Sequence, residues 1–229
     1  MWQAQYFVKI PQPKNHYVHV TCHLTPQKMP EEVEIFLPCW SPGSYLIREY
    51  AKHLRSLKVT NHLGEELIVE VKSKSAWTIF PQRDRFVKDN EYLVIHYEVY
   101  CHELSVRTSY IDSDHAFLQG PSYLIGFNAE GSELVAPSIE FEIPKEWSKI
   151  STSLPPDESV SREIFRYQAK NFDHLWDCPV QLGCHITDGF VCNNKQYALA
   201  LWGSEFPHLH NLKTDIKKIT SIANDYWVS

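Results

Sequence analysis

Long apolar runs and a secretory leader are both absent from this sequence of 229 residues. A membrane-spanning helix needs roughly 18 or more consecutive apolar residues, and no stretch of the chain reaches that length. The N-terminal segment, MWQAQYFVKIPQPKNHY, lacks the basic head, apolar middle and small-residue cleavage site of a signal peptide. We therefore expect a cytoplasmic protein with no membrane partner.

An excess of positive charge is lacking as well, because 22 Lys and Arg residues stand against 28 Asp and Glu residues, for a net charge of −6. Proteins that bind nucleic acid neutralise its phosphates with a surface rich in Lys and Arg. We therefore expect no nucleic-acid partner.

Closely spaced cysteine pairs are missing too, so the C-x-x-C pattern of structural zinc sites does not occur. The chain is large enough to fold without disulfides and has no export signal. We expect reduced, mostly buried thiols at all six cysteines, which are Cys22, Cys39, Cys101, Cys178, Cys184 and Cys192.

Short strand patterns fill most of residues 1–205. Apolar and polar residues alternate most clearly in EYLVIHYEVY, at 91–100, and in SIEFEIP, at 138–144. Turn signals recur every 8 to 14 residues or so, a spacing typical of β-sandwiches. The pattern predicts a mainly β domain, built as an antiparallel sandwich or a saddle-like sheet.

A different pattern follows residue 205, where apolar residues recur three or four positions apart in HLHNLKTDIKKITSIANDYW. This spacing predicts a C-terminal amphipathic helix of roughly five turns. Its apolar stripe must lie on the β domain or on a segment outside this sequence. The stripe consists of Leu209, Leu212, Ile216, Ile219, Ile222, Ala223 and Tyr226.

The segment PCWSPGSYLIREYAKH, at 38–53, combines a turn signal with aromatic and charged residues. Pro42 and Gly43 fit the central positions of a type II turn, because glycine tolerates the positive φ that the turn requires. The spacing of the apolar residues that follow predicts a short helix with one apolar face. That face would contain Leu46, Ile47, Tyr50, Ala51 and Leu54.

Residue types alone favour a structural role for this segment over a ligand site. Trp40 and Tyr45 would be packing anchors at a strand-turn-helix corner. Arg48 would either pair with Glu49 to fix the turn or lie buried beneath Trp40. An exposed ion pair of this kind contributes only about 0.2–1 kcal/mol, so we expect architecture rather than catalysis here.

The same segment resembles the signature of the glycyl aminopeptidases, metallopeptidase family sixty-one, which are gluzincin relatives of aminopeptidase N. Two later segments resemble the family in the same order: VRTSYIDSDHAFLQG, at 106–120, and FDHLWDCPVQLGCH, at 172–185. The second has Gln181 where the family usually has Glu. The signature residues are Trp40, Pro42, Gly43, Ser44, Tyr45, Arg48, Glu49 and Tyr50.

The resemblance implies a β-rich N-terminal domain followed by a thermolysin-like catalytic domain. In such a domain an H-E-x-x-H motif supplies two zinc ligands and a Glu that activates water. This motif does not occur here, since HELSV at His102 has only its first half. The resemblance therefore implies a chain truncated before the zinc motif, with a β-rich domain at 1–205 and the first catalytic-domain helix at 206–229.

The resemblance also implies a place where this domain meets substrate. In the aminopeptidase N relatives, a loop of the N-terminal domain presents a Gln near the first side chain of the substrate. Gln119 and Gly120 match that loop, and a neutral amide can bond a peptide without adding charge beside zinc. The cluster of Asp112, Asp114 and His115 lacks a nucleophile in a recognisable turn, so we interpret it as a turn capped by Asp.

The function that follows is a non-catalytic N-terminal domain of a zinc aminopeptidase, which supports the catalytic domain and lines one side of its substrate cleft. The expected partners are that catalytic domain, on the same or a separate polypeptide, and the peptide substrate of the complete enzyme. We expect no catalytic residue, metal site or cofactor in this chain, and zinc only in the full-length family.

Two alternatives remain at this level. A free-standing β-sandwich that binds peptide or glycan would use exposed aromatics around Trp40, Tyr45 and Tyr123, and would bury its helix stripe within the chain. An enzyme of another kind would need a cleft with a nucleophile and a base, and no sequence feature supports it.

Overall fold

The computed structural model describes residues 2–41, 44–81, 92–129, 135–161, 164–203 and 205–228. The fold is mainly β, as the alternating pattern predicts. Its strands are β1 (Gln3–Lys9), β2 (Tyr17–Thr25), β3 (Val33–Phe36), β4 (Leu54–Asn61), β5 (Ile68–Ser73), β6 (Ala76–Phe80), β7 (Leu93–Tyr100), β8 (Tyr110–Ile111), β9 (His115–Leu118), β10 (Gly126–Asn128), β11 (Ser138–Glu142), β12 (Lys149–Thr152), β13 (Phe165–Gln168), β14 (Val180–Gly183), β15 (Ile186–Cys192) and β16 (Lys195–Leu201). Its helices are α1 (Phe172–Trp176), α2 (Leu209–Val228) and the short 3-10 helices η1 (Pro13–Asn15), η2 (Tyr50–His53) and η3 (Gly120–Ser122).

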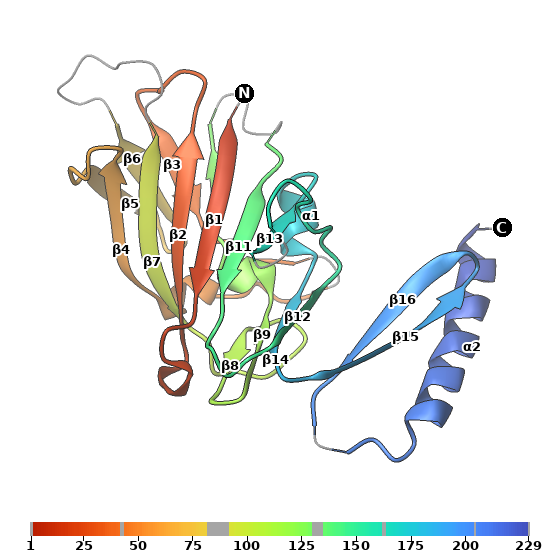
Figure 1. Cartoon of the computed structure of the whole chain (residues 1–229). Coiled ribbons are helices and arrows are strands. Elements are labelled where there is room, and N and C mark those ends of the chain that lie inside the picture. Colours follow the sequence, from red (N-terminus) through yellow and green to blue (C-terminus); the bar gives the residue numbers. More distant parts are fainter. Residues whose placement is uncertain are drawn as a thin grey trace.

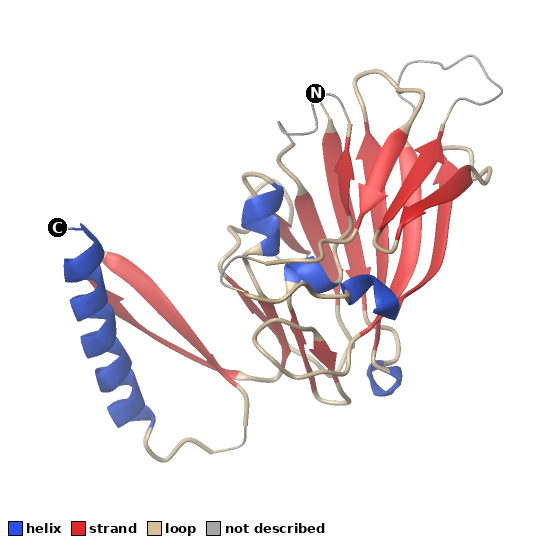
Figure 2. Cartoon of the chain, turned by 180° about the vertical axis from the view of Figure 1, so that it is seen from behind, coloured by secondary structure: helices blue, strands red, loops and turns tan. Residues whose placement is uncertain are grey.

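Three sheets form the body of the molecule. A six-stranded sheet has the order β13-β11-β1-β2-β7-β4, and two four-stranded sheets have the orders β10-β3-β6-β5 and β12-β14-β9-β8. The six-stranded sheet and the sheet that contains β3, β5 and β6 lie face to face (Figures 1 and 2). The pairing of β1 with β11 is parallel, and the other strand pairings between described residues are antiparallel.

The core lies between these two facing sheets, because one side of each strand carries apolar residues. In β2 and β7 every second residue is buried, as the period of two in a strand requires. Burying each such aliphatic side chain stabilises the fold by about 1.5–3 kcal/mol. The inward residues of these two strands are Val18, Val20, Cys22, Leu24, Leu93, Ile95, Tyr97 and Val99.

A buried segment at 119–127 crosses the core without a full strand ladder, so its backbone needs other hydrogen-bond partners. The Tyr6 hydroxyl donates to the carbonyl of Ile125 at 2.5 Å. The Tyr97 hydroxyl donates to the carbonyl of Tyr123 at 3.0 Å and accepts from the N–H of Ile125 at 3.1 Å. The Trp176 indole donates to the carbonyl of Leu124 at 3.2 Å. Side chains from several elements therefore hold this segment in place.

The structure bears on the cysteines and on membrane-spanning helices. All six cysteines are free, and all but Cys39 and Cys184 are buried, as predicted. Across the described ranges, no helix combines the length and the apolar character needed to cross a membrane.

Strands β15 and β16 form a separate hairpin, and α2 packs on it away from the three sheets (Figures 1 and 2). We call β15, β16 and α2 together the arm. The Lys213 ammonium lies 2.8 Å from the Asp188 carboxylate, and the Asn224 amide donates to the Tyr197 hydroxyl at 3.0 Å. The predicted C-terminal helix is therefore present, and a hairpin holds one of its faces.

The predicted apolar stripe of α2 divides into a covered and an uncovered part. Leu209 and Ile216 are half-buried. Leu212, Ile219, Ile222 and Tyr226 are exposed, at 39%, 67%, 62% and 73% of their surfaces. The β body covers none of these four side chains, so α2 presents an apolar face to solvent.

The predicted helix in 46–54 is shorter than expected. Only Tyr50–His53 forms a helix, of the 3-10 type, and its expected apolar face is incomplete. Leu46 and Ile47 are exposed at 62% and 77%, whereas Tyr50 is buried. The hydrogen bond from the Arg48 N–H to the Cys39 carbonyl, at 2.6 Å, draws this stretch back along the preceding chain instead of into a helical turn.

The first prediction concerns the buried tyrosine hydroxyl that holds the crossing segment. Tyr97→Phe leaves the carbonyl of Tyr123 and the N–H of Ile125 without this partner, so we expect a loss of about 1–3 kcal/mol in the free energy of unfolding. Urea unfolding followed by circular dichroism measures it. Tyr45→Phe is the matched control, because Tyr45 is fully exposed and should leave the midpoint unchanged. Equal midpoints for both variants would contradict this role.

A second prediction concerns alkaline pH. Burial raises the pKa of the Tyr6, Tyr97 and Tyr123 phenols above their usual value. Above pH of about 10 the unfolded chain releases phenolic protons that the folded chain retains, so the free energy of unfolding falls as pH rises. Phenolate absorbance should rise together with the loss of circular dichroism. Full ionisation of tyrosine in a protein that stays folded would disprove this expectation.

Candidate functional site

A cavity of about 690 Å³ lies where three segments that are distant in the sequence meet. We call it the family cavity, because its lining comes mainly from the three segments on which the family resemblance rests. The sequence analysis singled out the three segments, but it did not indicate that they meet in space. Among the lining residues are Trp40 and Ser41 from the first segment, Arg107 and Gln119 from the second, and His174 and Trp176 from the third.

The first segment is folded onto itself by local hydrogen bonds. The N–H of Ser44 donates to the Ser41 carbonyl at 3.1 Å, and the Trp40 indole donates to the Ser44 carbonyl at 2.7 Å. The Ser44 hydroxyl donates to the Leu46 carbonyl at 3.1 Å. Ser44 is buried, and the structural role expected for the signature residues stays a prediction. Pro42 and Gly43 lie outside the described residues, so their turn type stays a prediction.

Tyr50 ties this segment to the second one. Its hydroxyl donates to the Arg107 carbonyl at 2.7 Å. Burial raises the pKa of Tyr50, and this outweighs the opposing effects of a hydrogen bond with Ser41 and of the charges on Arg48 and Arg107. The phenol is therefore neutral at pH 7 and acts as a hydrogen-bond donor that joins the two walls.

One expectation for the signature is wrong, and one of the two alternatives for Arg48 is excluded. Tyr45 is fully exposed and Trp40 is 51% exposed, so Tyr45 does not anchor the packing. Glu49 lies 3.4 Å from Lys74, and within the described part of the chain no ion pair joins it to Arg48. The two side chains point in different directions. Glu49 points to the turn between β5 and β6, which carries Lys74, whereas the Nε of Arg48 is buried.

Two buried serines fix the backbone of Gln119. The N–H of Gln119 donates to the Ser109 hydroxyl at 2.9 Å, and its carbonyl accepts from the Ser122 hydroxyl at 2.8 Å. The two hydroxyls lie 2.6 Å apart. Sequence reasoning missed both serines. The only local signal is that Ser122 follows Gln119 by three residues, the spacing of a serine that caps a turn.

Gly120 is required by a close approach of two backbones. A Cβ at this position would lie 2.6 Å from the Cα of Trp176 and 2.7 Å from its carbonyl oxygen. Helix α1, which carries Trp176, is capped by Asn171, whose side chain accepts from the N–H of His174 at 2.8 Å. Only glycine at 120 allows this helix to close the third wall of the family cavity.

The family cavity combines charged, polar and apolar groups. Its polar groups include the Arg107 guanidinium, the Gln119 amide and the carboxylates of Asp173 and Asp177, beside an apolar wall that includes Trp176. Ser41 and His174 also line it, and the Nδ1 of His174 accepts from the N–H of Lys170 at 3.1 Å. Within the described ranges, no group of three or more His, Cys, Asp or Glu residues could hold a metal ion.

The Asp112 cluster is a turn, as interpreted from the sequence. The Asp112 carboxylate accepts from the N–H groups of Asp114 and His115 at 2.8 and 2.9 Å. Burial acts to raise the pKa of Asp112, but these hydrogen bonds outweigh it and lower that pKa. The His115 ring stacks on Trp202, which directly follows β16, with 4.1 Å between ring centres, so this turn also supports the arm.

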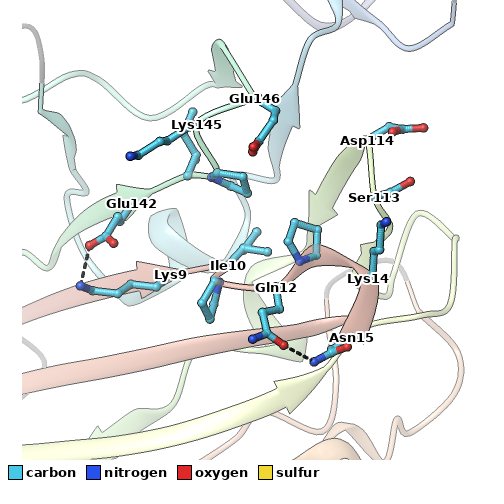
Figure 3. Close-up of a pocket in the computed structure, with 14 residues that line it drawn as sticks. Lys9, Ile10, Gln12, Lys14, Asn15, Ser113, Asp114, Glu142, Lys145 and Glu146 are labelled. Carbon is cyan, nitrogen blue, oxygen red and sulfur yellow. Dashed lines mark hydrogen bonds and ion pairs between the residues drawn. The ribbon is translucent and has the colours of Figure 1, made fainter.

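A larger hollow of about 1080 Å³ lies elsewhere, beyond the end of β1 (Figure 3). Lys9 pairs there with Glu142 at 2.5 Å, and Gln12 accepts from Asn15 at 2.7 Å. Lys9 and Glu142 are exposed, and such pairs contribute about 0–1 kcal/mol. Because its charges are exposed and its lining includes little of the family segments, the smaller cavity is the better candidate site.

Comparison with known proteins shows the family to which this fold is related. The family model described as "Peptidase M61 N-terminal domain" matches residues 5–184. An aminopeptidase N family protein from Idiomarina loihiensis has a similar structure, with a TM-score of 0.83 and 27% identity, over 97% of this chain and 36% of that protein. The chain thus spans little more than a third of that relative. No curated protein matches it.

Structures of an M1 zinc metallopeptidase mutant from Deinococcus radiodurans share the fold more distantly. One of them has a TM-score of 0.51 and 8% identity, over 98% of this chain and 52% of that protein. Another, with the same scores, contains a Tyr-Ser-Ala substrate. At this identity the similarity shows a common fold alone.

The third prediction tests the serine pair. Ser109→Ala removes the acceptor of the Gln119 N–H and the neighbour of the Ser122 hydroxyl, all buried, so we expect a loss of about 1–3 kcal/mol in the free energy of unfolding. Urea unfolding measures it. Ser148→Ala is the matched control because Ser148 is exposed, and substitutions at such sites stay within about 0.5 kcal/mol. A loss no larger than that of the control would show that the pair does not hold Gln119.

Proposed function

Because this chain belongs to the peptidase M61 N-terminal domain family, we propose that it is the non-catalytic N-terminal domain of a zinc aminopeptidase. In this role it supports the catalytic domain and lines one side of its substrate cleft. The observation that carries the proposal is the convergence of the three family segments around one cavity. The segments that carry the family resemblance gather at this cavity, so we expect a function common to the family to reside there.

Gln119 is the residue proposed to meet the substrate. Its backbone is fixed by Ser109 and Ser122, whereas no described residue hydrogen-bonds to its side-chain amide, which lines the family cavity. An amide offers both a donor and an acceptor to a peptide. Gly120 allows the backbone of this loop to lie close to that of Trp176, and this contact sets the position of the loop.

The proposed partners are the catalytic domain, on the same or a separate polypeptide, and the peptide substrate of the complete enzyme. The zinc of such an enzyme belongs to that domain, because the described residues of this chain contain no group that fits a metal ion. We therefore derive no chemical step in this chain. A cytoplasmic location remains part of the proposal.

The arm supplies a second argument for a partner domain. The apolar side chains of Ile219, Ile222 and Tyr226 are exposed, and a contiguous apolar surface of this kind marks an interaction site. The sequence places the domain boundary between 205 and 206. However, the family match ends at 184, and the hairpin packs on α2, so we propose that the boundary lies at 184–185, before the whole arm.

A free-standing module that binds peptide or glycan is the alternative. The exposure of Trp40 and Tyr45 favours it. Two observations oppose it: Tyr123, expected on the same surface, is only 1% exposed, and the stripe of α2 is not buried within the chain. The peptidase-domain role therefore explains more of the structure.

The fourth prediction tests Gln119 in the complete enzyme. Gln119→Ala removes one hydrogen bond to substrate, about 1 kcal/mol, so kcat/KM should fall roughly fivefold, mainly through KM. Steady-state hydrolysis of glycine p-nitroanilide with added zinc measures it. Gln12→Ala, in the larger hollow, is the matched control and should leave kcat/KM unchanged. Identical kinetics for wild type and Gln119→Ala would remove Gln119 from the substrate site.

The proposed roles of this chain and of the catalytic domain can be tested by reconstituting the enzyme from the two parts. The 229-residue chain alone should not hydrolyse the substrate, and zinc-dependent hydrolysis should appear when it is joined to, or mixed with, the catalytic domain. Hydrolysis by a catalytic domain that is equally fast without this chain would overturn the proposed supporting role.

A further inference from the structure

A separate hollow of about 550 Å³ lies behind the signature segment and shares no lining residue with the family cavity. We call it the Arg48 pocket. Its wall comes from the end of the signature and η2, from the end of β7, from the loop before β8 and from η3. The polar residues that define it are Arg48, Lys52, His53, His102, Thr108 and Ser109.

Arg48 has hydrogen-bonding capacity that the fold leaves unused. Its backbone N–H donates to the Cys39 carbonyl, but its side-chain Nε is buried and has no hydrogen-bond partner within the described part of the chain. A buried donor without a partner costs about 1–3 kcal/mol, and more when the group is charged. Native proteins rarely leave such a group unsatisfied, so the Nε of Arg48 indicates a missing acceptor.

The charges around the pocket favour a single negative charge. Arg48 and Lys52 supply two fixed cations, and the carboxylates present are Glu49 and Glu103. Glu49 lies 3.4 Å from Lys74, which stands outside the pocket and offsets the charge of Glu49. Arg48, Lys52 and Glu103 then leave one net positive charge. Burial, followed by the charge of Lys52, lowers the pKa of His53, so this ring is a neutral donor at pH 7.

We propose that the Arg48 pocket is a binding site for a carboxylate, presented by a short peptide or by a free small acid. A guanidinium binds a carboxylate through two parallel hydrogen bonds, which would occupy the unused Nε of Arg48. One carboxylate balances the excess cation, whereas a phosphate dianion would add repulsion from Glu103. The suggestion that a peptide supplies the carboxylate rests on the proposed function. The preference for a carboxylate rests only on the residues of the pocket.

The pocket also touches the machinery that positions Gln119. Ser109 and Ser122 line the Arg48 pocket, and their hydroxyls hold the backbone of Gln119 in the family cavity. A ligand seated over Arg48 therefore lies next to the residues that fix the proposed substrate loop. Binding should be detectable at the amide of Gln119 as well as in the pocket.

The test is a titration of the ¹⁵N-labelled 229-residue chain, followed by backbone amide shifts, with triglycine, triglycinamide and acetate. Triglycine should give saturable shifts at Arg48, His53 and Ser109. Triglycinamide, which lacks the carboxylate, should bind at least about tenfold more weakly, the loss expected for about 1.4 kcal/mol. Acetate that binds as tightly as triglycine assigns the site to free small acids; weaker binding of acetate assigns it to peptide ends.

Variants sharpen the test. Arg48→Gln should weaken triglycine about tenfold, whereas Arg55→Gln, which removes the same charge from an exposed position outside the pocket, should change it less than about twofold. Thermal unfolding shows whether each variant is folded. If Arg48→Gln does not fold, the comparison of triglycine with triglycinamide on the unaltered chain still decides whether the pocket binds a carboxylate.

Three results would overturn the proposal: no saturable shift in the pocket, equal affinity for triglycine and triglycinamide, or equal weakening by Arg55→Gln and Arg48→Gln. This outcome is separate from the proposed function. The titration needs no catalytic domain, whereas the function is tested by the kinetics of Gln119→Ala in the complete enzyme. Either can fail while the other stands.

Discussion

The backbone of residues 119–127 is buried, and its need for hydrogen-bond partners governs the rest of the structure. A strand ladder satisfies its end, at β10, and backbone bonds around η3 satisfy the N–H groups of Ser122, Tyr123 and Leu124. Side chains supply several of the remaining partners. Tyr6 and Tyr97 reach it from the six-stranded sheet, and Trp176 reaches it from α1. Because these donors come from elements that are far apart in the chain, the crossing segment fastens the sheets, α1 and the Gln119 loop into one body.

The candidate site inherits its rigidity from this arrangement. The family cavity and the Arg48 pocket lie on walls that Tyr50, Ser109 and Ser122 join by hydrogen bonds to buried backbone. Both walls offer shape, hydrogen bonds and charge to a ligand.

Much of the fold could be predicted because it follows local periodicity. The strand at Leu93–Tyr100 alternates, and the helix at Leu209–Val228 repeats every three or four residues. In residues 122–127, SYLIGF, only Gly126 and Phe127 join a strand, because tertiary hydrogen bonds replace a ladder in the rest. Tyr45 was expected inside and lies outside. The meeting of three remote segments had no local signal, since nothing in a single segment specifies its distant neighbours.

The parallel pairing of β1 with β11 has a consequence for how the chain acquires its structure. Gln5 lies beside Ser138, so the first strand occupies the middle of a sheet that cannot close until most of the chain has been synthesised. Contacts between residues so far apart slow folding, because the long intervening loop must be ordered before the pairing stabilises it. The arm, by contrast, is a hairpin followed directly by the helix that covers it. The arm can therefore fold soon after it has been synthesised, whereas β1 must wait for β11.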